Sequence, residues 1–130
     1  MANYYATARS NYFEVKDMDA FEEAMAPFGV EISQKHGTEM VCLLARGPDD
    51  GCFPSYDHEE EEEVEFVQIV APHLKDGWVG IIMEAGAEKM RYIHGHAVAF
   101  NNKGEERWVG LNNIYKLGKE LGEHVTDATY

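Results

Sequence analysis

Cysteine, long apolar runs and basic residues are all scarce in this sequence, and each shortage argues against a class of protein. Cys42 and Cys52 are the only cysteines and form no CxxC pair, so neither a disulfide framework nor a zinc knuckle is expected. No apolar stretch approaches the roughly 20 residues that cross a bilayer. The first residues also lack the basic and apolar regions of a signal peptide, so we expect a cytoplasmic protein.

The shortage of basic residues leaves a strongly acidic chain. Eleven lysine and arginine residues stand against 24 aspartate and glutamate residues, which gives a formal net charge of −13. Binding to nucleic acid depends on clustered basic side chains, and the sequence has no such cluster. We therefore expect neither direct nucleic-acid binding nor membrane binding, and a basic protein is the favoured partner.

The apolar content is that of a folded domain. Hydrophobic residues make up 45% and aromatic residues 12% of the 130 positions, well above the content of a disordered acidic chain. This length suits one core, and no linker or internal repeat divides it. Residues 1–130 are therefore expected to form a single acidic domain.

The spacing of apolar residues predicts an α+β fold. Strands are expected over residues 4–15, 30–34, 39–46, 78–83, 91–100 and 106–111. Helices are expected after an N-cap at Asp17 or Asp19, over residues 60–74, where Pro72 should shorten the last turn, and over residues 113–121. Residues 52–58 are expected to form a loop, and residues 85–87 an irregular connection. The order β-α-β-β-α-β-β-β-α has a ferredoxin-like opening and predicts a mostly antiparallel sheet with helices on one face.

One segment dominates the charge. Nine acidic residues and no lysine or arginine fall between positions 49 and 65, so the rest of the chain carries a net charge of only −4. These nine are the candidate partner-binding residues: Asp49, Asp50, Asp57, Glu59, Glu60, Glu61, Glu62, Glu63 and Glu65.

The acidic segment has three interpretations. If it opens a helix, successive turns hold carboxylates about 5–6 Å apart, a spacing similar to that of phosphates along a nucleic-acid strand. The segment would then imitate DNA. Alternatively, the glutamates form a solvated helix start that favours solubility. Calcium binding is the third interpretation, although Asp49-Asp50-Gly51 lacks the ligand spacing of an EF-hand.

Two smaller groups were weighed as sites. His94 and His96 share one face of an expected strand, and a metal there would need His58 or Cys52 as a further ligand; packing is the alternative role. A second group of charged residues surrounds the glycine-containing bend, where Glu84 or Glu88 is a candidate base and Arg91 an anion contact. Ion pairs that fix the bend are the alternative. No catalytic motif is present, so we expect no enzyme activity, no cofactor and no bound metal.

Two stretches carry a resemblance. Residues 3–17, NYYATARSNYFEVKD, and residues 84–92, EAGAEKMRY, resemble a family of small acidic proteins carried by phages and plasmids. Proteins of that setting include anti-CRISPR and anti-restriction inhibitors that imitate DNA. The resemblance implies an inhibitor of a defence complex in a bacterial host cell, and it implies no active-site residues.

Three functions therefore compete. The first is an inhibitor whose acidic surface blocks a nucleic-acid-binding channel of a basic protein. The second is an accessory module, a monomer or a homodimer, that binds another protein through a non-acidic face. The third is a small enzyme or metal protein that uses Glu84, His94 and His96.

Overall fold

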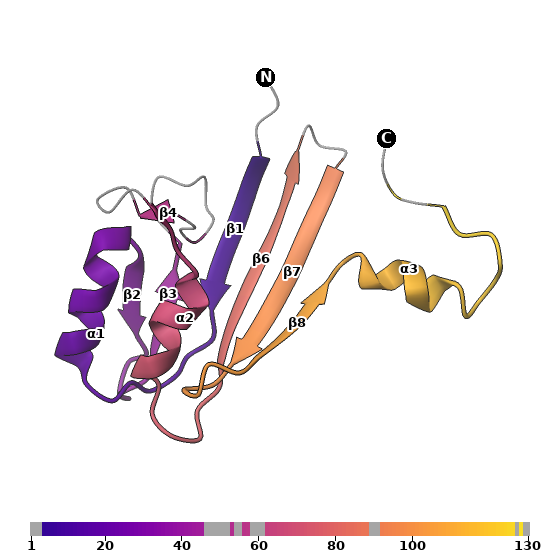
Figure 1. Ribbon diagram of the computed structural model, residues 1–130. Helices are drawn as coiled ribbons and strands as arrows, with labels where there is room; N and C mark the ends of the chain where they lie inside the picture. The colour runs from indigo at the N-terminus through magenta and orange to yellow at the C-terminus, as the bar shows by residue number, and fades with distance from the viewer. Residues whose placement is uncertain are drawn as a thin grey trace.

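A computed structural model describes residues 4–45, 53, 56–57, 62–88, 92–126 and 128 of the chain (Figure 1). Its main sheet has six antiparallel strands in the order β2-β3-β1-β6-β7-β8. Those strands are β1 (Tyr4–Ser10), β2 (Glu31–Gln34), β3 (Val41–Leu44), β6 (Gly80–Glu88), β7 (Tyr92–Phe100) and β8 (Glu106–Gly110). A separate hairpin pairs β4 (Tyr56–Asp57) with β5 (Glu62–Glu63). The helices are α1 (Met18–Met25), α2 (Phe66–Val70) and α3 (Asn113–Gly118), and the 3₁₀ turns η1 (Ala26–Phe28) and η2 (Ala71–His73) continue α1 and α2.

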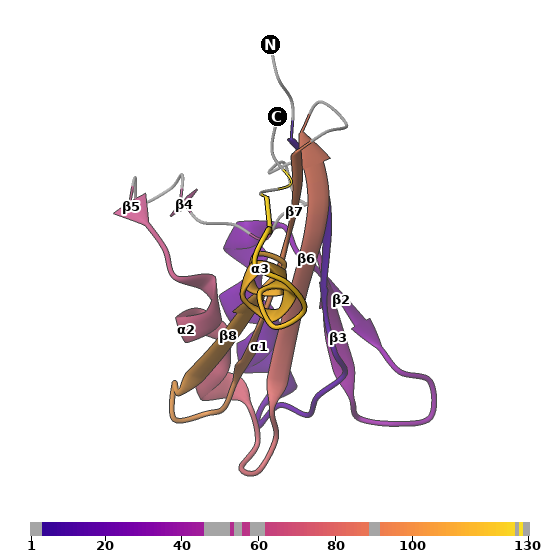
Figure 2. The ribbon, with the colours of Figure 1, turned by 90° about the vertical axis from the view of Figure 1, so that its right-hand side faces the viewer.

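The first part of the sheet has the expected ferredoxin-like topology. Strand β3 lies between β1 and β2, and β1 lies between β3 and β6, so each helical crossover skips one strand. Helices α1 and α2 cover the same face of this part of the sheet (Figures 1 and 2). The predicted α+β class and antiparallel sheet are therefore confirmed. Helix α3 does not cover this face and extends beyond the β8 edge of the sheet (Figure 1).

Helix α1 begins and ends where local chemistry predicts. The Asp17 carboxylate accepts hydrogen bonds from the backbone N–H groups of Asp19 and Ala20, at 3.0 and 3.3 Å. Phe21 and Met25, four residues apart, are buried against the sheet. Gly29, at φ 67°, takes the left-handed conformation that ends η1.

Removing the Asp17 cap gives a first prediction. Alanine at Asp17 leaves the Asp19 and Ala20 N–H groups without their carboxylate acceptor, and the expected loss is about 1 kcal/mol of unfolding free energy. Urea unfolding followed by circular dichroism measures this difference. Asparagine at the same position retains an acceptor oxygen, so Asp17→Asn should lose clearly less. Equal losses in the two variants would contradict the capping role.

Strand β1 contains a bulge that side chains stabilise. Arg9 is paired with Leu44 and Phe13 with Val41, so the first strand holds one more residue than β3 over this interval. The Ser10 hydroxyl accepts the Leu43 N–H at 2.7 Å. On the other side, the Asn11 side chain accepts the Ile81 N–H at 2.7 Å and donates to the Val79 carbonyl at 3.0 Å. Consecutive side chains thus tie β1 to both neighbours.

The second helix was predicted too long. The expected helix over residues 60–74 is replaced at its start by β5, and α2 begins only at Phe66, after Glu65 as N-cap residue. Part of the expected loop over residues 52–58 forms β4. The shortened end was predicted correctly, because Pro72 lies within η2. Among the described acidic residues of the segment, Glu65 therefore lies at a helix start, whereas Glu62 and Glu63 lie in a strand.

The irregular connection predicted over residues 85–87 was also wrong. Strand β6 runs without a break from Gly80 to Glu88, and every residue from Gly80 to Glu88 has a partner in β7. Glu84 therefore lies within a long strand rather than in a bend. Residues 89–91, which carry the candidate contact Arg91, lie outside the described residues.

Within the described part of the chain, no helix is both long enough and apolar enough to cross a membrane.

Candidate protein-binding surfaces

The predicted acidic site is only partly visible. Asp49, Asp50, Glu59, Glu60 and Glu61 lie outside the residues that the structure describes. In the β4–β5 hairpin, Asp57 is the partner of Glu62, and Glu63 is the partner of Tyr56. Glu65 is exposed at the start of α2.

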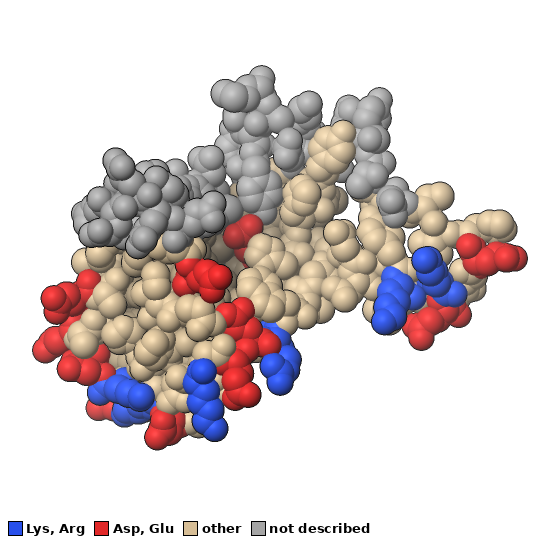
Figure 3. All heavy atoms as spheres, viewed as in Figure 1, with Lys and Arg blue, Asp and Glu red and all other residues tan. Residues whose placement is uncertain are grey.

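Further acidic residues lie on α1. Asp19, Glu22 and Glu23 are exposed, and the helix contains no lysine or arginine. In the space-filling view, acidic side chains gather over α1 and basic side chains lie below it (Figure 3). These carboxylates of α1 were not predicted as part of the site, because the acidic run between positions 49 and 65 is longer. The helix-side surface of the domain is thus negative beyond the predicted segment.

Lys75 neutralises a different set of carboxylates. Its Nζ lies 3.0 Å from Glu14 Oε1 and 3.7 Å from Glu39 Oε2. The hydrogen bond and charge of Glu14 raise the pKa of Lys75 above its ordinary value, with a smaller contribution from Glu39. Because the folded-state pKa is raised, this stabilisation is complete at neutral pH and is lost only as the pH rises through the alkaline range. Lys75 therefore does not offset the charge of α1.

Glu84 and His96 come together, as the catalytic hypothesis requires. They are partners in the β6–β7 register, and they line a cavity of about 390 Å³ between α2 and the sheet. Glu106 lies in the same wall and is held by donors: Trp108 Nε1 at 2.7 Å and Gln68 Nε2. The Gln68 bond connects α2 to β8, and the Trp108 bond lies within β8, so both give Glu106 a structural role.

The same cavity shows no metal centre. No group of three His, Cys, Asp or Glu side chains among the described residues has a metal-binding arrangement. The strand partner of His94 is Gly86, which offers no metal-binding side chain. The His96 ring packs at a tilt against the Trp108 ring, with centroids 5.8 Å apart. Cys52 and His58 lie outside the described residues. The geometry gives His96 a packing partner and the metal hypothesis no support.

The face of the sheet opposite α1 and α2 is apolar and uncovered in strands β1, β6, β7 and β8. We call this surface the open face. Strand alternation and the paired register place these residues on it: Thr7, Arg9, Ile81, Met83, Ala85, Ala87, Ile93, Gly95, Ala97, Ala99, Arg107 and Val109. None is acidic. Met83 is 59% exposed and Ile93 69% exposed, although side chains of this size are normally covered.

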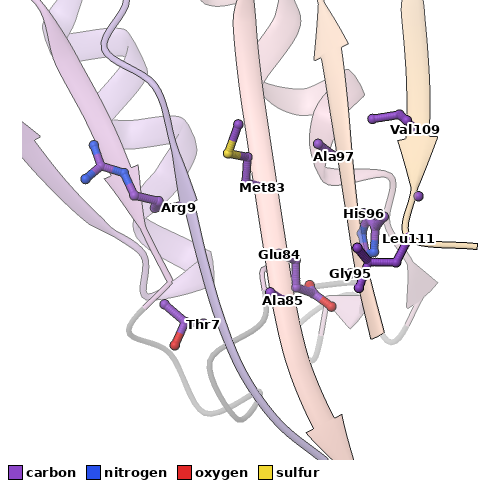
Figure 4. A pocket seen from close by; sticks show the side chains of 11 residues that line it. Thr7, Arg9, Met83, Glu84, Ala85, Gly95, His96, Ala97, Val109 and Leu111 are labelled. Carbon is purple, nitrogen blue, oxygen red and sulfur yellow. The ribbon is translucent and has the colours of Figure 1, made fainter. Parts of the chain in front are cut away.

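A trough crosses the open face. Thr7, Ala85 and Gly95 are register partners in three neighbouring strands, so small residues form one row. Met83 and Val109 lie in the row on one side (Figure 4), and Ile93 lies in the row on the other side. The resulting hollow measures about 490 Å³. Its lining is almost entirely apolar, which suits an apolar partner surface better than a charged substrate.

Helix α3 is held in a fixed position beside this trough. The Leu111 N–H donates to the Gly95 carbonyl at 2.9 Å, and the Gly110 N–H donates to Asn113 Oδ1 at 2.7 Å. A Cβ atom at Gly95 would lie 2.9 Å from Leu111 Cδ1, so this glycine allows the close approach. In the segment after α3, the Ala128 N–H donates to the hydroxyl of Tyr115, a residue of the helix.

No residue of α3 itself is buried. Ile114 and Leu117 of α3 are exposed, and so is Leu121, which is 94% exposed in the turn that follows the end of the helix at Gly118. We call these three residues the α3 stripe. Figures 1 and 2 show the helix standing beyond the edge of the sheet, away from α1 and α2. The stripe and the open face are thus two apolar surfaces of one chain.

The residue pattern of β6 and β7 could have predicted the open face. In β6 and β7, the positions that alternate with the core residues are themselves alanine, glycine, methionine or isoleucine rather than polar residues. Antiparallel strands with one solvated face normally alternate apolar and polar residues. The lack of polar alternation indicates that both faces are meant to be covered.

Comparison with known proteins found no matching family model, no matching curated protein and no matching solved structure. The resemblance to small phage and plasmid proteins therefore stays a prediction.

Proposed function

We propose that the protein is a non-catalytic inhibitor that binds a basic, nucleic-acid-binding protein through its acidic helix-side surface. In the described part of the chain this surface comprises Glu65 and the exposed carboxylates of α1, and we propose that the acidic segment, which includes Glu60, Glu61, Glu62 and Glu63, contributes to the same contact. Following the resemblance, the proposed target is a CRISPR or restriction complex of a bacterial host cell. Blocking its nucleic-acid channel requires no cofactor and no direct contact with nucleic acid.

The observation that carries the proposal is the separation of charge between the two faces. The chain has a net charge of −13. Nevertheless, none of the open-face positions of β1, β6, β7 and β8 is acidic. The carboxylates of α1 and the N-cap residue Glu65 belong to the helix side. A negative potential concentrated on one side attracts and orients a basic partner better than the same charge spread evenly.

Capture and inhibition together test the proposal. The tagged protein is used to retain proteins from a bacterial lysate at about 0.05 M and about 0.5 M salt, concentrations at which surface charges are weakly and strongly screened. We expect a nucleic-acid-binding defence component to be retained at low salt and released at high salt. The purified component should then lose nucleic-acid binding when the protein is added.

Charge reversal identifies the surface responsible. Lysine at Glu60, Glu61, Glu62 and Glu63 should abolish inhibition, and the milder pair Glu22→Lys and Glu23→Lys should weaken binding by about tenfold. The matched control is Glu105→Lys with Glu123→Lys, which changes the net charge as much as the milder pair but away from α1. Unchanged binding in the first two variants, or equal weakening in the control, would refute the assignment.

A further inference from the structure

The open face and the α3 stripe complement one another in shape, yet one chain cannot bring them together as it stands. The trough over Thr7 and Ala85 is a low row that Leu111 of the same chain closes at Gly95, and such a row accepts the ridge of a helix. The stripe is such a ridge. Helix α3 follows the bonds at Gly110 and Leu111 and extends beyond the β8 edge of its own sheet (Figure 1).

We propose that two copies of this chain form a symmetric dimer in which the α3 stripe of each copy lies in the open-face trough of the other. A two-fold axis creates this contact twice, because each copy offers both surfaces. The assembly covers Met83 and Ile93 of the sheet together with Leu117 of α3 and Leu121 of the turn after it. The sheet edge is not the interface.

Charge selects a second copy as the occupant. Two chains that each carry −13 repel one another, and they associate only where carboxylates do not oppose each other. The open face contributes Arg9 and Arg107 and no acidic residue. Residues 113–123 hold two lysines and two glutamates and are formally neutral. These are the surfaces through which two copies meet without burying a carboxylate.

The available area is sufficient for a dimer. Strands β6 and β7 have nine residues each, which corresponds to a length of about 30 Å, and the four strands span about 14 Å between their outer axes. Their projected area is about 400 Å². Helix α3, with six residues and a length of about 9 Å, adds a further projected area of about 100 Å². Accessible area exceeds projected area, so each copy approaches the about 800 Å² that a stable interface buries per partner.

Salt dependence separates this inference from the inhibitor proposal, on which it does not rest. Screening reduces the repulsion between two acidic copies, so the dimer should become more stable between about 0.05 M and about 0.5 M salt. Binding of a basic partner to the acidic surface should weaken over the same range. Failure of either expectation leaves the other intact.

Sedimentation equilibrium of the purified full chain measures the association. We expect a mass twice that of the monomer at high protein concentration and high salt. Ile93→Lys on the sheet and Leu117→Lys on α3 each place a charge in both contacts of a symmetric dimer, and each should weaken dimerisation by about a hundredfold, about tenfold per contact. Ala20→Lys, at an exposed position of α1, is the matched control and should leave the dimer unchanged.

A third variant, Leu117→Glu, tests which surfaces meet when it is mixed with Ile93→Lys. The heterodimer keeps one unaltered contact, between α3 of the Ile93→Lys chain and the sheet of the Leu117→Glu chain, and its other contact places a lysine opposite a glutamate. The mixture should therefore associate more tightly than either variant alone. A monomer at every salt and protein concentration would overturn the proposal. A dimer that neither variant weakens, or a mixture no tighter than its components, would overturn it as well.

Discussion

Replacing Phe21 by alanine is expected to lower the free energy of unfolding by about 3–5 kcal/mol, the largest effect anticipated for a single side chain here. The Phe21 ring is fully buried and meets Phe13 edge-on, with centroids 6.1 Å apart, and His73 at 5.5 Å. It thereby joins α1 to the residues after β1 and to η2. A domain of this size is stable by only about 5–15 kcal/mol, so the variant should unfold at a much lower urea concentration.

The neighbouring residue provides the control for this experiment. Glu22 is exposed on the same helix, and Glu22→Ala should change stability by less than about 0.5 kcal/mol. Because α1 carries part of the acidic surface, the Phe21 variant should also bind the proposed basic partner more weakly as it approaches its unfolding transition. A loss below about 1 kcal/mol would mean that the site relaxes around the missing ring.

The sequence was most informative where local chemistry decides the structure. The N-cap at Asp17, the end of α1 near Gly29 and the β7–β8 turn, whose Gly104 has φ 81°, all follow from short-range rules. The burial of Phe21 and Met25 follows from helical spacing. Together these elements were enough to predict the ferredoxin-like opening.

The errors arose where distant partners decide. Residues 85–87 contain a glycine and read as a break, but β6 is paired with β1 on one side and β7 on the other, and two ladders outweigh the low strand preference of Gly86. Similarly, the glutamate run was compatible with a helix start, yet Glu62 and Glu63 pair with β4. Local sequence contains no information about such pairings.

The candidate surfaces also divide into one that local sequence predicts and one that depends on tertiary contacts. Composition alone predicted an acidic protein, and the location of the longest acidic run could be read directly. The open face depends on which way α3 leaves the sheet, and that direction is set by the contact of Leu111 with Gly95 on a neighbouring strand. The last helix was predicted over residues 113–121, whereas α3 ends at Gly118 and none of its residues is buried.

The second large effect is expected at the bulge of β1, where two polar side chains replace missing backbone partners. Ser10 is 2% exposed, and its hydroxyl accepts the buried Leu43 N–H while donating to the Asn11 carbonyl at 2.7 Å. An unsatisfied buried N–H costs about 1–3 kcal/mol, so Ser10→Ala should lose that amount. Asn11→Ala removes the bonds to β6 and should have an effect of similar size.

The double variant should lose on the order of 3–4 kcal/mol, because each side chain connects β1 to a different neighbour. Urea unfolding measures all three variants. Asn11→Asp is the matched comparison, since it keeps the oxygen that accepts the Ile81 N–H and removes the donor to the Val79 carbonyl, and it should lose less than Asn11→Ala. If the alanine variants were as stable as the parent, the bulge would be satisfied by water rather than by these side chains. A sheet joined in this way keeps the acidic helix layer and the open face at a fixed distance on opposite sides of β1, which both proposed interactions require.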